Sequence, residues 1–337
     1  MYYNKFCVSR TVCGVCERDI SMNTEKRYNG KTRAVRPCLV AILLIALAAA
    51  LLRTVAIFTA YDSAIGYFSR GAALPVLATA LCVIGCIASV AFPFVTRIDG
   101  KDIPPVGARG SASVYFATAY AAFVMLGAFG YELYRCITAN TAGKLFAEAS
   151  AKAASENAYA ARSLRIQGIL IIIGIVSSAL SAVYFVLRLG EKRSSDEWHV
   201  LFGFAPGLRC VAGLSIYFDM TIEMNSPNKL MLQAALISIM IYFLFELRML
   251  LGFKKARPRA YAAAGLLATT LTASASVSVI AGYFSGQVAS AAFFTEAFFC
   301  FNMMVYMMVR TVSFITAAAT PAAPAAVQDT ANTAEDR

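Results

Sequence analysis

Four charged residues lie inside long apolar stretches of the sequence, where burying a charge is costly. Arg53, Arg209, Glu246 and Glu296 each stand among aliphatic and aromatic neighbours. Charged side chains within a membrane usually face the interior of a helix bundle or a water-filled cavity. The chemistry that they favour is ion pairing and the binding of a polar or charged solute.

The depth of these charges predicts which of them meet. Arg53 lies roughly 10 Å, and Glu296 roughly 12 Å, from the outer end of its stretch at about 1.5 Å per residue. Arg209 lies somewhat deeper. We therefore expect Arg53 and Glu296 to pair, and Arg53, Arg209 and Glu296 to line a polar pocket in the outer half of the protein. Two alternatives stay open: a buried ion pair that only fixes helix register, or arginines that extend to the interface.

Three acidic candidates, two of them not yet named, lie near the ends of the stretches. Asp62 and Asp219 follow Tyr61 and Tyr217 at outer ends, where tyrosine is typical of the interfacial aromatic belt. Their carboxylates would guard an outer entrance if they have a functional role. Glu246 lies near the cytoplasmic end of its stretch, and we expect it to extend to that interface.

The other reactive residues are poorly placed for catalysis. His199 is the single histidine, so neither a metalloprotease ligand set nor a Ser/His pair within a span can be assembled. Cys7, Cys13 and Cys16 are three close cysteines, whereas zinc usually takes four ligands. No Gly-rich phosphate-binding loop is present. We expect no catalytic residue, metal or cofactor, and an enzyme acting on lipid is the weakest of the functional hypotheses.

The elements that position these residues follow from composition. The chain has 337 residues, of which 59% are hydrophobic and 15% charged, whereas soluble domains carry about 25% charged residues. Its apolar stretches are apolar on every face, unlike the alternating strands of a membrane barrel. We predict an all-α polytopic integral membrane helix bundle with about eight transmembrane helices. The spans are expected at 38–60, 72–95, 112–135, 166–188, 199–219, 230–251, 260–283 and 288–310.

The span at 199–219 contains Gly203, Pro206 and Gly207, which are poor helix formers. Without it, the basic cluster between Lys254 and Arg259 would lie outside, against the positive-inside rule. With it, the basic N-terminal tail and the most basic loops share one side. We therefore expect a plasma membrane protein, of bacterial origin, with both ends cytoplasmic and the lipid bilayer as its main partner.

The net charge of +11 does not indicate nucleic acid, because the basic residues gather at span ends instead of forming one patch. Residues 136–165 are the exception to the charge rule. There Lys144, Glu148, Lys152 and Glu156 are four apart and form one charged stripe. We expect a helix lying on the outer surface.

The predicted domain organisation is a basic cytoplasmic tail (1–37), two four-helix halves (38–188 and 199–310) and a disordered cytoplasmic tail (317–337). Arg53 and Tyr61 align with Arg209 and Tyr217 at one constant spacing, which favours a parallel 4+4 internal repeat. The alternative is convergent membrane composition. Met22 is an alternative start, in which case residues 1–21 are not translated.

Two classes of function fit these patterns. The buried charges and the suspected repeat favour a permease-like transport protein. The alternative is a non-transporting membrane sensor, scaffold or assembly component, which would form a complex with another membrane protein or with copies of itself.

Overall fold

A computed structural model of the chain describes residues 14–63, 65–98, 111–154, 158–189, 197–219, 226–251, 257–288 and 291–319. Side chains are described from Val35 onward, except those of residue 154, residues 197–199 and Asp219. The helices are α1 (Gly14–Ala60), α2 (Ala73–Val95), α3 (Ala112–Thr138), α4 (Thr141–Ala154), α5 (Ala158–Leu189), α6 (Glu197–Gly203), α7 (Ala205–Asp219), α8 (Pro227–Leu250), α9 (Pro258–Phe284) and α10 (Ala291–Ala319). Two short antiparallel strands, β1 (Tyr61–Asp62) and β2 (Tyr67–Phe68), join α1 to α2.

Eight segments of these helices are long and apolar enough to cross a membrane, so the predicted all-α polytopic bundle is confirmed. A helix satisfies its backbone hydrogen bonds within itself, which is what a segment in lipid requires. The spanning part of α1 is Val35–Ala60, and the last segment continues to Ala319. That end lies beyond the predicted one at 310, and the difference changes the environment of Arg310.

The predicted span at 199–219 is confirmed, but it is built from two helices. The apolar segment Val200–Phe218 contains the end of α6 and most of α7, which meet at Phe204. Pro206 lacks a backbone N–H and so is tolerated in the first turn of α7. A Cβ on Gly203 would lie 2.2 Å from a Leu247 methyl carbon, so this glycine lets α6 approach α8 closely.

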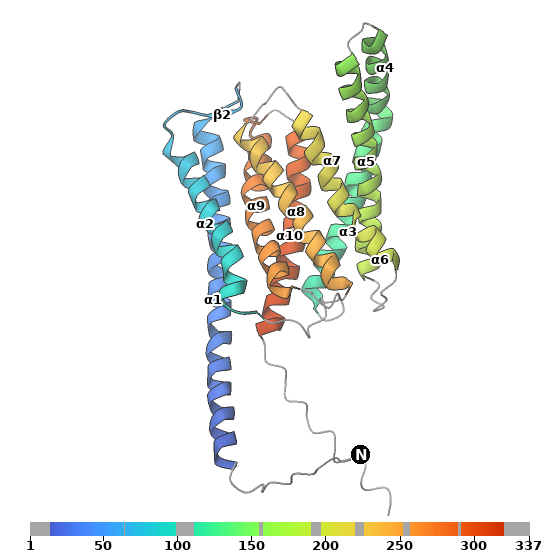
Figure 1. Ribbon diagram of the computed structural model, residues 1–337. Coiled ribbons are helices and arrows are strands. Elements are labelled where there is room, and N and C mark those ends of the chain that lie inside the picture. Colours follow the sequence, from blue (N-terminus) through green and yellow to red (C-terminus); the bar gives the residue numbers. More distant parts are fainter. Residues whose placement is uncertain are drawn as a thin grey trace, which may run out of the picture.

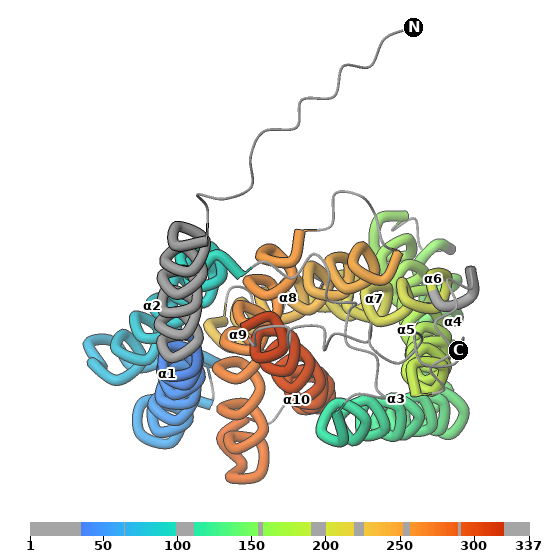
Figure 2. The backbone as a smooth tube through the Cα atoms, turned by 90° about the horizontal axis from the view of Figure 1, so that it is seen from below, coloured from blue at the N-terminus to red at the C-terminus, as the bar shows by residue number. Residues whose placement is uncertain are grey.

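The helices are arranged around α9 and α10, which occupy the middle of the bundle (Figures 1 and 2). Helix α9 packs against α1, α2, α8 and α10, and 78% of its most apolar 18-residue segment is buried. Helices α3, α5 and α7 pack on the opposite side from α1 and α2. The first four spans therefore do not pack as a unit of their own, because α1–α2 and α3–α5 flank the later helices.

Small residues let the central helices approach closely. A Cβ on Gly265 of α9 would lie 2.0 Å from Oγ1 of Thr311 in α10. The Ser89 and Thr270 hydroxyls are 3.1 Å apart and link α2 to α9. In lipid, helices gain little from burying apolar surface, so close backbone packing and hydroxyl contacts of this kind contribute most to association.

Helices α4 and α5 form a hairpin that projects beyond the neighbouring helices (Figure 1). With 32 residues, α5 is about 48 Å long, more than the ~30 Å hydrocarbon core requires. Helix α4 stands along α5 instead of lying on the surface, so the expected orientation of this helix is wrong. The reason is its own apolar face: Ala142 and Ala149 are buried and Gly168 of α5 lies against Phe146.

The charged stripe expected on α4 is present in part. Glu148 and Lys152 form an exposed i,i+4 ion pair at 3.1 Å, while Glu156 lies outside the described residues. The spanning part of α1 begins, and α10 ends, at the same end of the bundle (Figure 1). Which side of a membrane this end faces stays a prediction.

Candidate functional site

The candidate site is a buried ion-pair network centred on Arg209 of α7. The two terminal nitrogens of its guanidinium donate to both carboxylate oxygens of Glu296 in α10, at 3.2 and 3.0 Å. One of these nitrogens also donates to Oε1 of Glu132 in α3, at 2.8 Å. The side chains of Arg209 and Glu296 are each 7% exposed and that of Glu132 is 17% exposed. Three helices that are distant in sequence thus meet at one cation.

Neighbouring residues hold this network in place. The Ser178 hydroxyl of α5 donates to Oε2 of Glu132 at 3.1 Å, and the Arg209 guanidinium lies 5.1 Å from the centre of the Phe299 ring. A Cβ on Gly213 would be 2.6 Å from Oε1 of Glu296. The glycine one turn after Arg209 therefore makes the room that the carboxylate occupies.

A cavity of about 170 Å³ adjoins the network. Glu132, Arg209 and Glu296 line it, together with the aliphatic side chains of α5 and α7. Its lining residues are Glu132, Arg135, Thr141, Leu170, Ile171, Gly174, Ile175, Arg209, Ala212, Gly213, Ile216, Tyr217, Ala292, Thr295 and Glu296. A small apolar-walled cavity with a few converging polar groups is typical of a solute-binding site.

The expected partnership of Arg53 with Glu296 is wrong. One terminal nitrogen of Arg53 donates to the backbone oxygen of Pro227, at 3.0 Å, and to Oδ1 of Asn228, at 3.2 Å. Its guanidinium lies 5.7 Å from the centre of the Phe68 ring, and the residue is 3% exposed. Equal depth does not make two charges neighbours: α1 packs mainly on α2 and α9, while the partner of Glu296 comes from α7.

Glu246 forms a second buried cluster, so its expected extension to the interface is also wrong. The residue has no exposed surface. Its Oε1 is 3.0 Å from Nε of Arg310 and 3.9 Å from a terminal nitrogen of Arg188, and it accepts the Tyr306 hydroxyl at 3.0 Å. Packing of α5, α8 and α10 around this carboxylate replaces the water that it would have reached at an interface.

Asp62, one of the two aspartates expected at an outer entrance, is not among the residues that line the cavity. Asp62 is exposed in β1, beside α1 and α2, on the far side of the bundle from α3, α5 and α7. The side chain of Asp219 lies outside the described residues. The idea that these carboxylates guard an entrance stays a prediction.

Glu132, Arg188 and Arg310 are the charged residues that sequence reasoning missed. Glu132 lies near the end of its predicted span, where a charge is ordinarily interfacial. Arg310 stands at the predicted end of the last span, but α10 continues for nine residues to Ala319. The apolar run after Arg310 was the available signal, because a charge followed by more than two further apolar turns lies inside the span.

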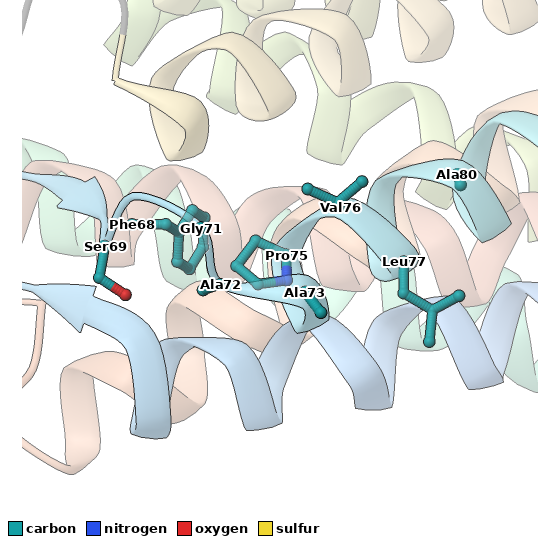
Figure 3. A pocket seen from close by; sticks show the side chains of 9 residues that line it. All are labelled: Phe68, Ser69, Gly71, Ala72, Ala73, Pro75, Val76, Leu77 and Ala80. Carbon is teal, nitrogen blue, oxygen red and sulfur yellow. The ribbon is translucent and has the colours of Figure 1, made fainter.

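A second hollow, of about 480 Å³, lies where β2 leads into α2. Figure 3 shows its lining, which is apolar apart from the Ser69 hydroxyl. Val76 and Leu77 are 70% and 54% exposed, as expected of side chains that face lipid. It offers no charged group to a solute, so we assign the candidate site to the Arg209 cavity.

No protein-family model matches this chain, and neither the comparison with curated proteins nor that with solved structures finds a match. The eight apolar helices define the chain as a multi-pass membrane protein. Any narrower function depends on the geometry of its own side chains.

Proposed function

We propose that the protein is a permease-like transport protein that binds a small solute in the cavity beside Arg209. The observation that supports this most is a guanidinium shared by Glu132 and Glu296 at the wall of an adjoining cavity. Buried ionisable residues within membrane bundles mark substrate and ion pathways more often than other positions do.

The second ion-pair cluster supports a transport cycle. Glu296 and Arg310 both belong to α10, fourteen residues or about 21 Å apart along the helix, and each joins a different buried network. Alternating access requires contacts that close one end of a bundle while the other end opens. Ion pairs at two depths of one helix provide such contacts, the first holding α10 to α3 and α7 and the second holding it to α5 and α8.

The test is transport by the purified protein in liposomes. We expect saturable uptake of at least one member of a panel of small labelled amines, amino acids, sugars and carboxylates. Arg209→Gln should abolish this uptake, because the network that joins α3, α7 and α10 loses the guanidinium at its centre. Lys152→Gln, on the exposed face of α4, is the matched control and should transport normally. Uptake no greater than that of empty liposomes, for every member of the panel, would refute the proposal.

The projecting α4–α5 hairpin favours a second candidate, a non-transporting sensor, scaffold or assembly component. A helical pair beyond the bundle offers a surface to another membrane protein or to a second copy of the chain. This hypothesis predicts a stable complex that survives mild detergent and is lost when the hairpin is shortened. Purification as a single-chain monomer would count against it. For either function we propose a bacterial plasma membrane, with both chain ends cytoplasmic.

A further inference from the structure

We propose that the Arg209 cavity binds a small organic cation, an alkylammonium group, with its positive charge against Glu132. This inference specifies the substrate class of the transport site proposed above and rests on that site being functional. The charge of the cavity, its walls and its volume each support the inference.

The network contains two carboxylates but one guanidinium. Arg209 and Glu296 form a bidentate pair, in which each carboxylate oxygen accepts a hydrogen bond from one terminal nitrogen of the guanidinium. Such a pair is geometrically complete. Glu132 shares a nitrogen that this pair already uses, and within the described part of the chain its other oxygen accepts a hydrogen bond from the neutral Ser178 hydroxyl alone. One guanidinium thus serves two carboxylates, and Glu132 holds the unbalanced negative charge.

The nearby Arg135 does not remove this imbalance. It lines the same cavity, but it is exposed and its guanidinium lies 5.8 Å from the centre of the Tyr131 ring. Among the described side chains, it forms an ion pair with neither Glu132 nor Glu296. In the described part of the chain, Arg209 supplies both ion pairs of this network. A buried charge without a full partner is costly, so the site favours an added cation.

The walls select the kind of cation. Leu170, Ile171, Ile175 and Ile216 face the cavity, and aliphatic walls suit a hydrocarbon body better than a hydrated metal ion. A calcium ion would take six to eight oxygen ligands, whereas two carboxylates and a few hydroxyls are present here. The volume of about 170 Å³ is close to that of a cavity of about 150 Å³ that accepts benzene. An amine of about four to six carbons therefore fits.

The experiment measures binding to the purified full-length protein in detergent at neutral pH. The probes are butylammonium, 1-butanol as its neutral match and sodium as a bare cation. We expect saturable thermal stabilisation and a calorimetric isotherm with butylammonium, and neither with 1-butanol or sodium. Glu132→Gln should weaken butylammonium binding at least tenfold, because it removes the unbalanced charge and keeps the Arg209–Glu296 pair. Glu148→Gln on α4 should bind as the unchanged protein does.

A second variant tests binding without removing a charge, so that lost binding in Glu132→Gln can be distinguished from misfolding. Ile216→Phe adds volume to the cavity wall and leaves every charge in place, so it should also weaken binding at least tenfold. The inference is overturned if Glu132→Gln and Ile216→Phe both bind normally, if 1-butanol binds as well as butylammonium, or if sodium alone stabilises the protein. Butylammonium binding without uptake of any solute would refute the transport function alone. Uptake of a neutral or anionic solute, without butylammonium binding, would refute the substrate class alone.

Discussion

Of the three charged residues predicted to lie in the outer half, Arg53, Arg209 and Glu296, Arg209 makes the most side-chain interactions. It contacts Glu296 and the Phe299 ring of α10 and Glu132 of α3. Each contact therefore comes from a helix other than its own and depends on how the whole bundle packs. Arg53 is equally buried yet donates to neutral oxygens of α8. The same residue type at a similar depth thus has two roles, one within a charged network and one as a link between helices.

Replacing Arg209 should destabilise the protein strongly. Arg209→Gln leaves two buried carboxylates without a cation, and breaking a buried ion pair in this way costs about 3–5 kcal/mol. Unfolding of the purified protein in increasing denaturant measures the free energy of unfolding. Lys152→Gln, which breaks the exposed pair with Glu148, should cost less than about 1 kcal/mol. Equal effects of the two changes would show that the network is not a buried ion-pair system.

At the scale of the elements, small residues decide how closely the helices pack. Gly265 lets α9 approach Thr311 of α10, and Gly213 makes room for the Glu296 carboxylate. Gly127 of α3 differs, since a Cβ there would meet no heavy atom within 4 Å. The sequence shows all three as glycines within apolar spans, and packing alone distinguishes them.

Two glycine substitutions test this packing. In Gly265→Ala, the new methyl group would overlap Thr311, and overpacking of this kind costs about 1–3 kcal/mol. In Gly127→Ala, the methyl group meets open space and alanine is the better helix former, so stability should be unchanged or slightly raised. Thermal unfolding of the two variants side by side gives the comparison. A Gly265→Ala protein as stable as Gly127→Ala would contradict the close α9–α10 contact.

At the scale of the whole molecule, the later helices form the centre and the earlier ones flank it. Helices α9 and α10 lie between the α1–α2 pair and the α3–α5 pair (Figure 2). The parallel 4+4 repeat stays a prediction. Packing differs between the two halves: α8 packs along α9, while α2 packs on α1 and α9 instead of on the following span.

The orientation of the whole molecule is testable by labelling. The charge rule puts the α4–α5 hairpin outside and the start of α9 inside. A membrane-impermeant maleimide should therefore label Lys152→Cys in intact cells, and should label Arg257→Cys only after permeabilisation. Both positions are exposed, and labelling of the native cysteines is subtracted with the unchanged protein. The reverse pattern would invert the proposed topology.

The lipid environment of the chain, its helices and their approximate ends were predictable from sequence, because each depends on local residue composition. A run of apolar residues determines its own partition into lipid, and a helix satisfies its own backbone hydrogen bonds. The ends were less predictable where a charge lies inside a span, as at Arg310, since a charged residue near the end of an apolar run is typical of an interface.

The candidate site was predictable only in part. Sequence alone indicated that Arg209 and Glu296 are buried in the outer half, because depth along a helix follows from residue number. Only the tertiary structure decided that they pair with each other, that Glu132 joins them and that Arg53 bonds to α8 instead. Those partners depend on which helices lie side by side, and lateral neighbours are set by close packing among distant segments that no single span encodes.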